Sequence, residues 1–189
     1  MNKILAQLHQ YAALSTDAQE AIGQALQKNH YAKNDFLLRK GQVCRHIYFI
    51  EKGALRGFYH TEEKEISHWF AFENDFVTSF HSFITGEPAV ENIQFLEGAV
   101  LWAIPKDTLH ELFDRFHEIE RLVRIAYEKY YLRLEERFVN AQFKTAAERY
   151  EELLLTHPHI INRVPLGQVA SYLGISQETL SRVRAGAMK

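Results

Sequence analysis

The hydrophobic pattern of the chain changes near residue 106, and this change limits the fold more than any other feature. Before it, between residues 35 and 105, short apolar runs alternate with turn signals such as Lys40-Gly41, Lys52-Gly53 and Gly86-Glu87-Pro88. Turns roughly every 8 to 12 residues, with β-branched and aromatic residues between them, are typical of an antiparallel sandwich or barrel. The glycines and the turn spacing exclude a helical domain in this stretch. The clearest expected strands are His46–Glu51, Ala54–Tyr59, Ile66–Phe72, Ile93–Leu96 and Val100–Ile104.

The pattern on both sides of this stretch is helical. Residues 3–29 are predicted to form two helices, with Ser15-Thr16-Asp17 as the N-cap cluster of the second. From Glu118 to Thr145 the sequence contains no Gly or Pro, which indicates one long helix. A further amphipathic helix is expected from about Thr145 to Leu155, where His157-Pro158 ends it.

The long helix carries an apolar stripe that a small β-domain cannot cover completely. A helix of about 25 residues extends roughly 40 Å. The stripe therefore predicts a second copy of the chain in a parallel, coiled-coil-like pairing. The alternative is that the helix packs only on its own domain. The residues of this predicted dimer stripe are Ile119, Leu122, Val123, Ala126, Tyr130 and Leu134.

The sequence from Val164 onward predicts a helix-turn-helix. Gly174 stands where a first helix must end in a left-handed backbone conformation, which glycine adopts most readily. Ser176 is placed to cap a second helix. Ala170 is small enough to let that second helix approach the first. The expected inner faces consist of Leu166, Val169, Ala170, Leu173, Leu180 and Val183.

The outer face of the second helix carries side chains that read base edges. Arginine pairs with guanine, glutamine pairs with adenine, and glutamate accepts from cytosine in a major groove. From Asn162 to Lys189 four cations stand against one acid, so a basic head is joined to an acidic body. A helical hairpin that does not bind DNA is the alternative. The cations are Arg163, Arg182, Arg184 and Lys189, and the predicted DNA-binding residues are Ser176, Gln177, Glu178, Thr179, Ser181, Arg182 and Arg184.

The composition narrows the class of protein further. Of 189 residues, 47% are hydrophobic and 24% are charged, with a formal net charge of −2, which excludes a wholly basic coating protein. We expect a cytoplasmic protein that does not enter a membrane, because neither a signal peptide nor a membrane-length apolar run is present. Cys44 is the only cysteine, which excludes an internal disulfide and a four-cysteine iron–sulfur cluster. Because the histidines lack metal-site spacing and no catalytic motif is present, we expect no metal, no cofactor and no enzymatic activity.

A β-roll, a long helix and a C-terminal helix-turn-helix, in this order, resemble the Crp/Fnr family of bacterial transcription regulators. The most specific match is Ser176–Arg182, which is similar to the recognition-helix pattern Ser-Arg-Glu-Thr-hydrophobic-x-Arg of the family. Gln177 stands where the family more often has Arg, which leaves the target sequence open. We therefore predict an α+β fold. It has a jelly-roll-like β-roll with N-terminal helices over residues 1–115, a dimerisation helix over 116–143 and a DNA-binding helix-turn-helix over 144–189.

The effector pocket is where the sequence departs from the family. Members that bind cyclic AMP hold the ribose with Gly-Glu and the cyclic phosphate with a later Arg. Here Thr78-Ser79 replaces Gly-Glu, and the stretch from Gly86 to Asn92 contains no Arg or Lys. A buried phosphate needs a charge-assisted donor, so we predict that this β-roll does not bind cyclic AMP in the usual way. Backbone N–H groups alone could hold a phosphate, and a hydrophobic effector is the alternative to a core filled by phenylalanines. The candidate pocket residues are Phe76, Thr78, Ser79, Phe80, Glu87, Glu91 and Asn92.

These observations lead to the hypothesis of a homodimeric regulator that binds double-stranded DNA. An unknown small-molecule effector and RNA polymerase are the further partners that the resemblance implies. Only five residues follow Arg184, so we expect no full β-hairpin wing. Two alternatives remain: a small-molecule-binding module with a weak or vestigial DNA-binding head, and a cupin-like enzyme, which would need histidines clustered inside the barrel.

Overall fold

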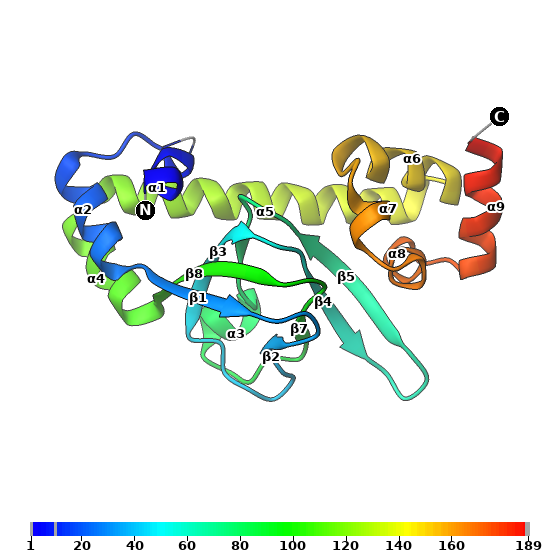
Figure 1. The fold of residues 1–189 in the computed structure, drawn as a ribbon, viewed down its shortest axis with the longest axis horizontal. Coiled ribbons are helices and arrows are strands. Elements are labelled where there is room, and N and C mark those ends of the chain that lie inside the picture. The colour runs from blue at the N-terminus through cyan, green and yellow to red at the C-terminus, as the bar shows by residue number, and fades with distance from the viewer. Residues whose placement is uncertain (1, 10, 188–189) are drawn as a thin grey trace.

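Figure 1 shows the computed structural model of the chain, which describes residues 2–9 and 11–187. The architecture is organised along one long helix, α5 (His117–Phe143). Helices α1 (Asn2–Leu8) and α2 (Thr16–Ala25) lie at one end of α5, and the C-terminal helices lie at the other. The β-domain lies against α5 between these two groups (Figure 1).

The β-domain consists, within the described residues, of two antiparallel sheets. One has the strand order β1-β8-β3-β6 and the other β2-β7-β4-β5. Burial alternates along β7 and β8, as expected for strands with one face toward a core. The α+β fold with a jelly-roll-like β-roll is confirmed. The strands are β1 (Gln27–Tyr31), β2 (Phe36–Leu38), β3 (His46–Lys52), β4 (Leu55–His60), β5 (Glu65–Ala71), β6 (Phe76–Val77), β7 (Asn92–Phe95) and β8 (Ala99–Pro105).

The prediction of helix up to residue 29 is wrong at its end, because Gln27–Tyr31 is strand β1. It pairs antiparallel with β8, with Gln27 opposite Ala103 and Tyr31 opposite Ala99. Its sequence is mostly polar and shows no apolar alternation, so the strand is recognised only from its backbone pairing with β8. The short elements β2, β6, α3 (Phe80–Thr85) and α7 (Ile160–Arg163) also escape prediction, because they are too short to show a period.

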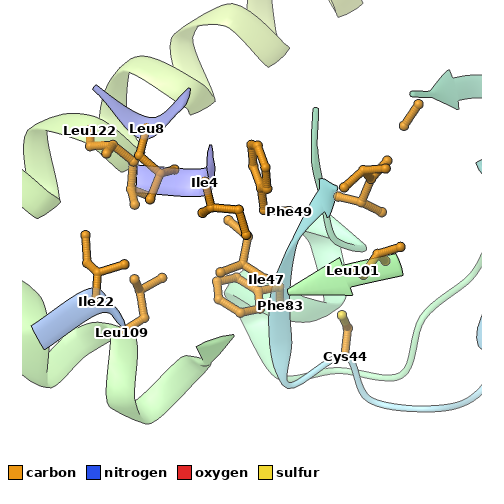
Figure 2. Close-up of a cluster of buried hydrophobic side chains, with 14 of the residues drawn as sticks. Ile4, Leu8, Ile22, Cys44, Ile47, Phe49, Phe83, Leu101, Leu109 and Leu122 are labelled. Carbon is orange, nitrogen blue, oxygen red and sulfur yellow. The ribbon is translucent and has the colours of Figure 1, made fainter. Parts of the chain in front are cut away.

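The main core joins the N-terminal helices to the β-roll and to α5. Ser15 caps α2, since its Oγ accepts a hydrogen bond from the N–H of Ala18 at 3.2 Å. Figure 2 shows Ile4, Leu8 and Ile22 directed toward side chains of β3, α4 (Lys106–Arg115) and α5. All three are almost completely buried, so the first two helices are an integral part of the β-domain.

The C-terminal helices begin where a capping box starts α6 (Ala146–Thr156). The Oγ1 of Thr145 accepts from the N–H of Glu148 at 3.3 Å, and Glu148 Oε2 accepts from the N–H of Thr145 at 2.7 Å. Helices α7, α8 (Leu166–Leu173) and α9 (Gln177–Ala187) follow. The division into residues 1–115, 116–143 and 144–189 stays a prediction.

Candidate nucleic-acid interface and effector region

A tight turn joins α8 to α9. Gly174 has φ 68° and ψ 32°, a left-handed conformation that favours glycine, and its N–H closes the end of α8. The N–H of Ile175 donates to the carbonyl of Ala170 at 3.0 Å. Ser176 then caps α9, because its Oγ accepts from the N–H of Thr179 at 3.2 Å. The two helices and their turn form a helix-turn-helix.

The inner faces of α8 and α9 pack into a second apolar core with α6 and α7. Val169, Ala170 and Leu180 are almost completely inaccessible to solvent. This core fixes the rotation of α9 about its own axis, and therefore decides which side chains face outward. Its buried members on the C-terminal helices are Tyr150, Leu153, Ile160, Val164, Val169, Ala170, Leu173 and Leu180.

The seven predicted DNA-binding residues lie together at the start of α9 and along its length. Gln177, Glu178 and Arg182 are exposed, as are Ser176 and Ser181. Thr179 and Arg184 are partly buried. The Arg182 guanidinium donates to Thr179 Oγ1 at 3.4 Å, a contact weak enough to exchange for a base or phosphate. Lys189 lies outside the described residues.

The predicted effector-pocket residues lie in different surroundings. Thr78 and Ser79 are buried, and the Thr78 hydroxyl donates to the carbonyl of His46 at 3.0 Å. Glu87 is exposed, whereas Asn92 accepts from the N–H of Lys40 at 3.0 Å. These four residues serve the turns of the β-roll and do not converge on one cavity.

Glu91 is turned inward, where it meets the side chains of two neighbouring β5 residues. Its Oε2 lies 2.5 Å from His68 Nε2 and accepts from Trp69 Nε1 at 3.1 Å. The Trp69 indole lies directly over Gly57, so closely that a side chain at residue 57 would collide with it. Tyr59 stacks on His68 with 4.4 Å between ring centroids. A buried carboxylate, bonded to an imidazole and an indole, therefore lies within the stretch from Gly86 to Asn92.

Phe76 and Phe80 face α5. The Phe80 ring stacks on Tyr130 with 3.9 Å between centroids and meets Tyr127 edge-on at 5.3 Å. Burial is the main reason that the pKa of Tyr130 is raised to about 12. These aromatic contacts connect α3 of the β-roll to the middle of the long helix.

Comparisons with known proteins agree with this geometry. Residues 28–116 match the family model of the cyclic nucleotide-binding domain. No curated protein sequence matches the chain. The structure of FixK2 from Bradyrhizobium japonicum superposes with a TM-score of 0.74 at 15% identity, covering 85% of this chain and 83% of that chain. The regulator CLP from Xanthomonas campestris gives a TM-score of 0.69 at 15% identity, covering 92% of each chain. A crp/fnr-family protein from Eubacterium rectale gives 0.69 at 17% identity, covering 90% and 82%.

The chain has the fold of the Crp/Fnr regulators. At these identities the likeness concerns the fold, so the roles of single residues depend on the geometry of this chain. Two features of this structure differ from the sequence predictions, and a third was not predicted.

The first difference concerns the predicted dimer stripe. Ile119, Leu122, Val123 and Ala126 are buried in the core of their own chain, because the first half of α5 packs on the β-roll and the N-terminal helices. Tyr130 is partly covered by Phe80. These five side chains are therefore not available to a partner in this arrangement, and of the predicted stripe Leu134 alone is exposed.

Other apolar side chains of α5 are exposed instead. They lie on the second half of the helix, beyond the β-roll, and Phe138 and Phe143 expose 66% and 83% of their surface. We call this set the α5 apolar face, and its members are Tyr131, Leu132, Leu134, Phe138, Val139 and Phe143.

The second difference concerns Arg163, which the sequence counts among the cations of the DNA-binding head. Its guanidinium is bound by two carboxylates of the β-roll turns, with Nη1 2.7 Å from Glu73 and further bonds to Glu97. Burial alone would raise the pKa of Glu73, but hydrogen bonds from Arg163 and from the N–H of Gly53 outweigh it and lower the pKa to about 2. Arg163 therefore joins the head to the β-roll in this structure.

The third feature is the contact between α8 and β5, which no sequence pattern indicates (Figure 1). The Ser171 hydroxyl donates to the carbonyl of Glu65 and accepts from the N–H of Ser67, both at 3.0 Å. Tyr172 lies against Phe70, with 5.3 Å between ring centroids. The head is thereby held on the edge of the β-roll of its own chain.

Sequence reasoning also missed Arg56, a buried cation on β4. Its guanidinium pairs with Glu65 at 2.7 Å, donates to Gln94 Oε1 at 2.8 Å and lies over the Phe58 ring. Its position between the apolar residues Leu55 and Phe58 was the one available signal. In this structure the Nε and Nη2 atoms of Arg56 are bonded to Gln94 and Glu65.

Two negative observations apply to residues 2–9 and 11–187. No three histidine, cysteine, aspartate or glutamate side chains come together there as metal ligands would. Within the same ranges, every helix is too short or too polar to cross a membrane.

Proposed function

We propose that the chain is a homodimeric, sequence-specific DNA-binding transcription regulator of bacteria, acting in the cytoplasm without enzymatic activity. The observation that carries the proposal is the outer face of α9. Gln177, Glu178 and Arg182 are exposed at the start of a capped helix whose other face is locked in a core. Recognition helices use these positions to contact base edges in a major groove.

The chemistry of this face suits a mixed sequence. Arg182 can donate two parallel hydrogen bonds to a guanine, Gln177 can pair with an adenine, and Glu178 can accept from a cytosine amino group. Arg184 and the dipole at the N-terminus of α9 would contact phosphates. Arg163 is excluded from this set while Glu73 and Glu97 bind it.

Dimerisation is proposed through the α5 apolar face. Exposed leucine, tyrosine and phenylalanine side chains along one helix lose contact with water when a second copy pairs with it. Parallel pairing would carry two α9 helices to successive major grooves, about 34 Å apart on the DNA. The expected operator is therefore a near-palindrome.

The test is a selection of random duplex DNA by the purified full-length protein without added ligand. The proposal predicts enrichment of a palindrome with half-sites one helical turn apart. A variant in which Gln177, Glu178 and Arg182 are all replaced by alanine serves as control, and it should enrich no sequence. Enrichment of the same palindrome by that variant, or of no sequence by either protein at low salt, contradicts the proposal.

A further inference from the structure

A bulge interrupts the pairing of β4 with β5 and gives β5 an extra residue. Gly57 lies opposite Trp69, and Phe58 lies opposite Ser67, so His68 is inserted between these two pairs. An extra residue of this kind breaks the alternation of a strand and re-aims a side chain. As a result His68 and Trp69, although consecutive, reach the same buried carboxylate.

That carboxylate belongs to Glu91, on the segment between α3 and β7, and only 7% of Glu91 is accessible to solvent. Its Oε2 lies 2.5 Å from His68 Nε2 and accepts from Trp69 Nε1 at 3.1 Å. A carboxylate withdrawn from water needs a charged or hydrogen-bonding partner. The indole supplies a neutral donor at every pH, whereas the imidazole supplies a neutral or a cationic donor, depending on the pH.

The other ionisable groups around this pair keep one charge state near neutral pH. Burial is the main cause that raises the pKa of Tyr59 and raises that of Tyr130 to about 12, and Glu91 contributes to both shifts. Burial lowers the pKa of Arg137, but an arginine stays charged throughout the neutral range. Of these groups and His68, the imidazole is the one whose charge ordinarily changes between pH 5 and pH 8.

The bulge is directly connected to the C-terminal helices. The residue before His68 is Ser67, whose N–H donates to Ser171 Oγ of α8 at 3.0 Å. The carbonyl of Ser67 accepts from Arg137 Nη2 at 3.4 Å, and the guanidinium carbon of Arg137 lies 4.6 Å from the centroid of the Tyr172 ring. Burial is the main cause that raises the pKa of Tyr172, so this tyrosine is neutral. Adjacent residues of β5 therefore bind the buried carboxylate on one side and α8 on the other.

We propose that His68 is a proton-binding site that controls how firmly the C-terminal helices rest on the β-roll. When His68 takes up a proton, its hydrogen bond to Glu91 becomes an ion pair, and such charge-assisted bonds are about twice as strong as neutral ones. The bulge is then held more tightly, and with it Ser67 and its bond to Ser171. When His68 loses the proton, neutral donors alone hold the bulge, and the contact with α8 loosens. The ligand is the proton itself, and its binding does not depend on whether the chain binds DNA.

The first test follows the fluorescence of Trp69, because a protonated imidazole quenches a neighbouring indole. The rings of His68 and Trp69 meet edge-on with 5.9 Å between centroids. The chain has two tryptophans, so Trp102→Phe leaves Trp69 as the only one. In the full-length Trp102→Phe protein, the tryptophan emission should fall in one step between pH 8 and pH 5. Constant emission over this range would overturn the proposal.

Matched variants of the Trp102→Phe protein assign the step to the pair. His68→Gln keeps a hydrogen-bond donor but does not titrate, so its emission should be constant. His60→Gln removes an exposed histidine of β4 and should leave the step unchanged. Glu91→Gln keeps an acceptor but removes the negative charge, so the step should move to a lower pH. Circular dichroism at pH 8 shows whether each variant is folded. A step that survives in His68→Gln, or that stays at the same pH in Glu91→Gln, would refute the assignment.

The connection to the C-terminal helices is measured by ¹H–¹⁵N NMR of the full-length protein over the same pH range. The amide signals of Ser67 and Ser171 should shift with the midpoint of the fluorescence step, and in His68→Gln this shift should be lost. Ser171→Ala should keep the fluorescence step, since the quenching depends on His68. A fluorescence step without a shift of either amide would contradict the control of the contact with α8. Neither measurement contains DNA, so a negative result here leaves the proposed function as it stands.

Discussion

At the scale of single residues, ion pairs between Arg163 and two carboxylates join the C-terminal helices to the β-roll. The pKa of one of these carboxylates, Glu73, is lowered. Glu73 accepts from two guanidinium nitrogens of Arg163 and from the backbone of Gly53. Arg163 also lies over the Phe72 ring, with its guanidinium carbon 5.1 Å from the centroid. A carboxylate held in this way gives up its charge only in strong acid, which makes the contact sensitive to pH in a defined window.

We predict that the contribution of Glu73 to stability is lost in acid. The pKa of Glu73 falls from an ordinary 4.5 to about 2 in the folded chain. Its contribution is therefore fully present above pH 4.5 and disappears as the pH falls from there toward 2. Thermal unfolding of the parent and of Glu73→Gln should differ at pH 7 and become more alike at pH 3. Glu62→Gln, in an exposed turn, should behave as the parent at both pH values. The same destabilisation of Glu73→Gln at pH 7 and pH 3 would contradict this account.

A second prediction at this scale concerns Arg182. We expect Arg182 to pair with a guanine. Arg182→Ala should then weaken the free energy of specific DNA binding by about 1–3 kcal/mol and relax the base preference at one base pair of each half-site. A gel-shift series with the selected palindrome and its single-base variants measures both effects. Lys33→Ala, in the turn between β1 and β2, provides the control at an exposed lysine of the β-roll. Unchanged affinity and base preference in the Arg182 variant would show that α9 is not the reading element.

At the scale of elements, α5 has two halves with different roles. The first half completes the core of the β-roll through Ile119, Leu122 and Val123. The second half extends past the β-roll and exposes the α5 apolar face. The helix therefore has one apolar side that is already used and another that is not.

We predict that the same substitution acts differently in the two halves. Leu122→Ala should lower the free energy of unfolding by about 2–5 kcal/mol, because it opens a cavity in the core. Leu132→Ala should leave the folded monomer intact and weaken dimerisation about tenfold, because it removes an exposed contact. Denaturant unfolding of dilute protein and sedimentation equilibrium separate the two effects. The opposite result would be a Leu132→Ala protein that still dimerises and a Leu122→Ala protein that is stably folded but monomeric. That result would assign the interface to the other face of α5.

At the scale of the whole molecule, residues 28–116 match the model of a cyclic nucleotide-binding domain, yet the stretch from Gly86 to Asn92 contains no Arg or Lys. We predict that millimolar cyclic AMP leaves the melting temperature unchanged. The reason is that a buried carboxylate, Glu91, lies in the stretch where a phosphate would need a cation, and Arg56 is already paired with Glu65. A protein that binds the nucleotide would be stabilised in proportion to the logarithm of its concentration. Differential scanning fluorimetry across a cyclic AMP series measures this, with 5′-AMP as the matched control. A saturable increase with cyclic AMP alone would contradict the prediction.

The sequence predicted the elements whose side chains alternate or repeat, such as β3, β8 and the helix-turn-helix, because periodic burial is what fixes them. It did not predict β1, since the residues from Gln27 to Tyr31 show no apolar alternation, and their strand is defined by backbone pairing with β8. The stripe on α5 was found, but a stripe does not reveal what covers it, and Leu122 proved to face its own chain. The same limit applies to Arg163 and Glu91, whose partners are far away in the sequence. The seven residues of α9 lie together, while their DNA contacts stay a prediction.

The second apolar core determines whether the C-terminal helices could fold when separated from the β-roll. Two of its buried members, Ala54 and Leu96, come from the β-roll, and Phe70 and Phe72 pack against it. A fragment cut at residue 144 would lose this wall and expose the apolar side chains that rest on it. The C-terminal helices are therefore not an independent folding unit: grafted onto another protein or released by a protease, they would need another apolar surface in place of the missing one.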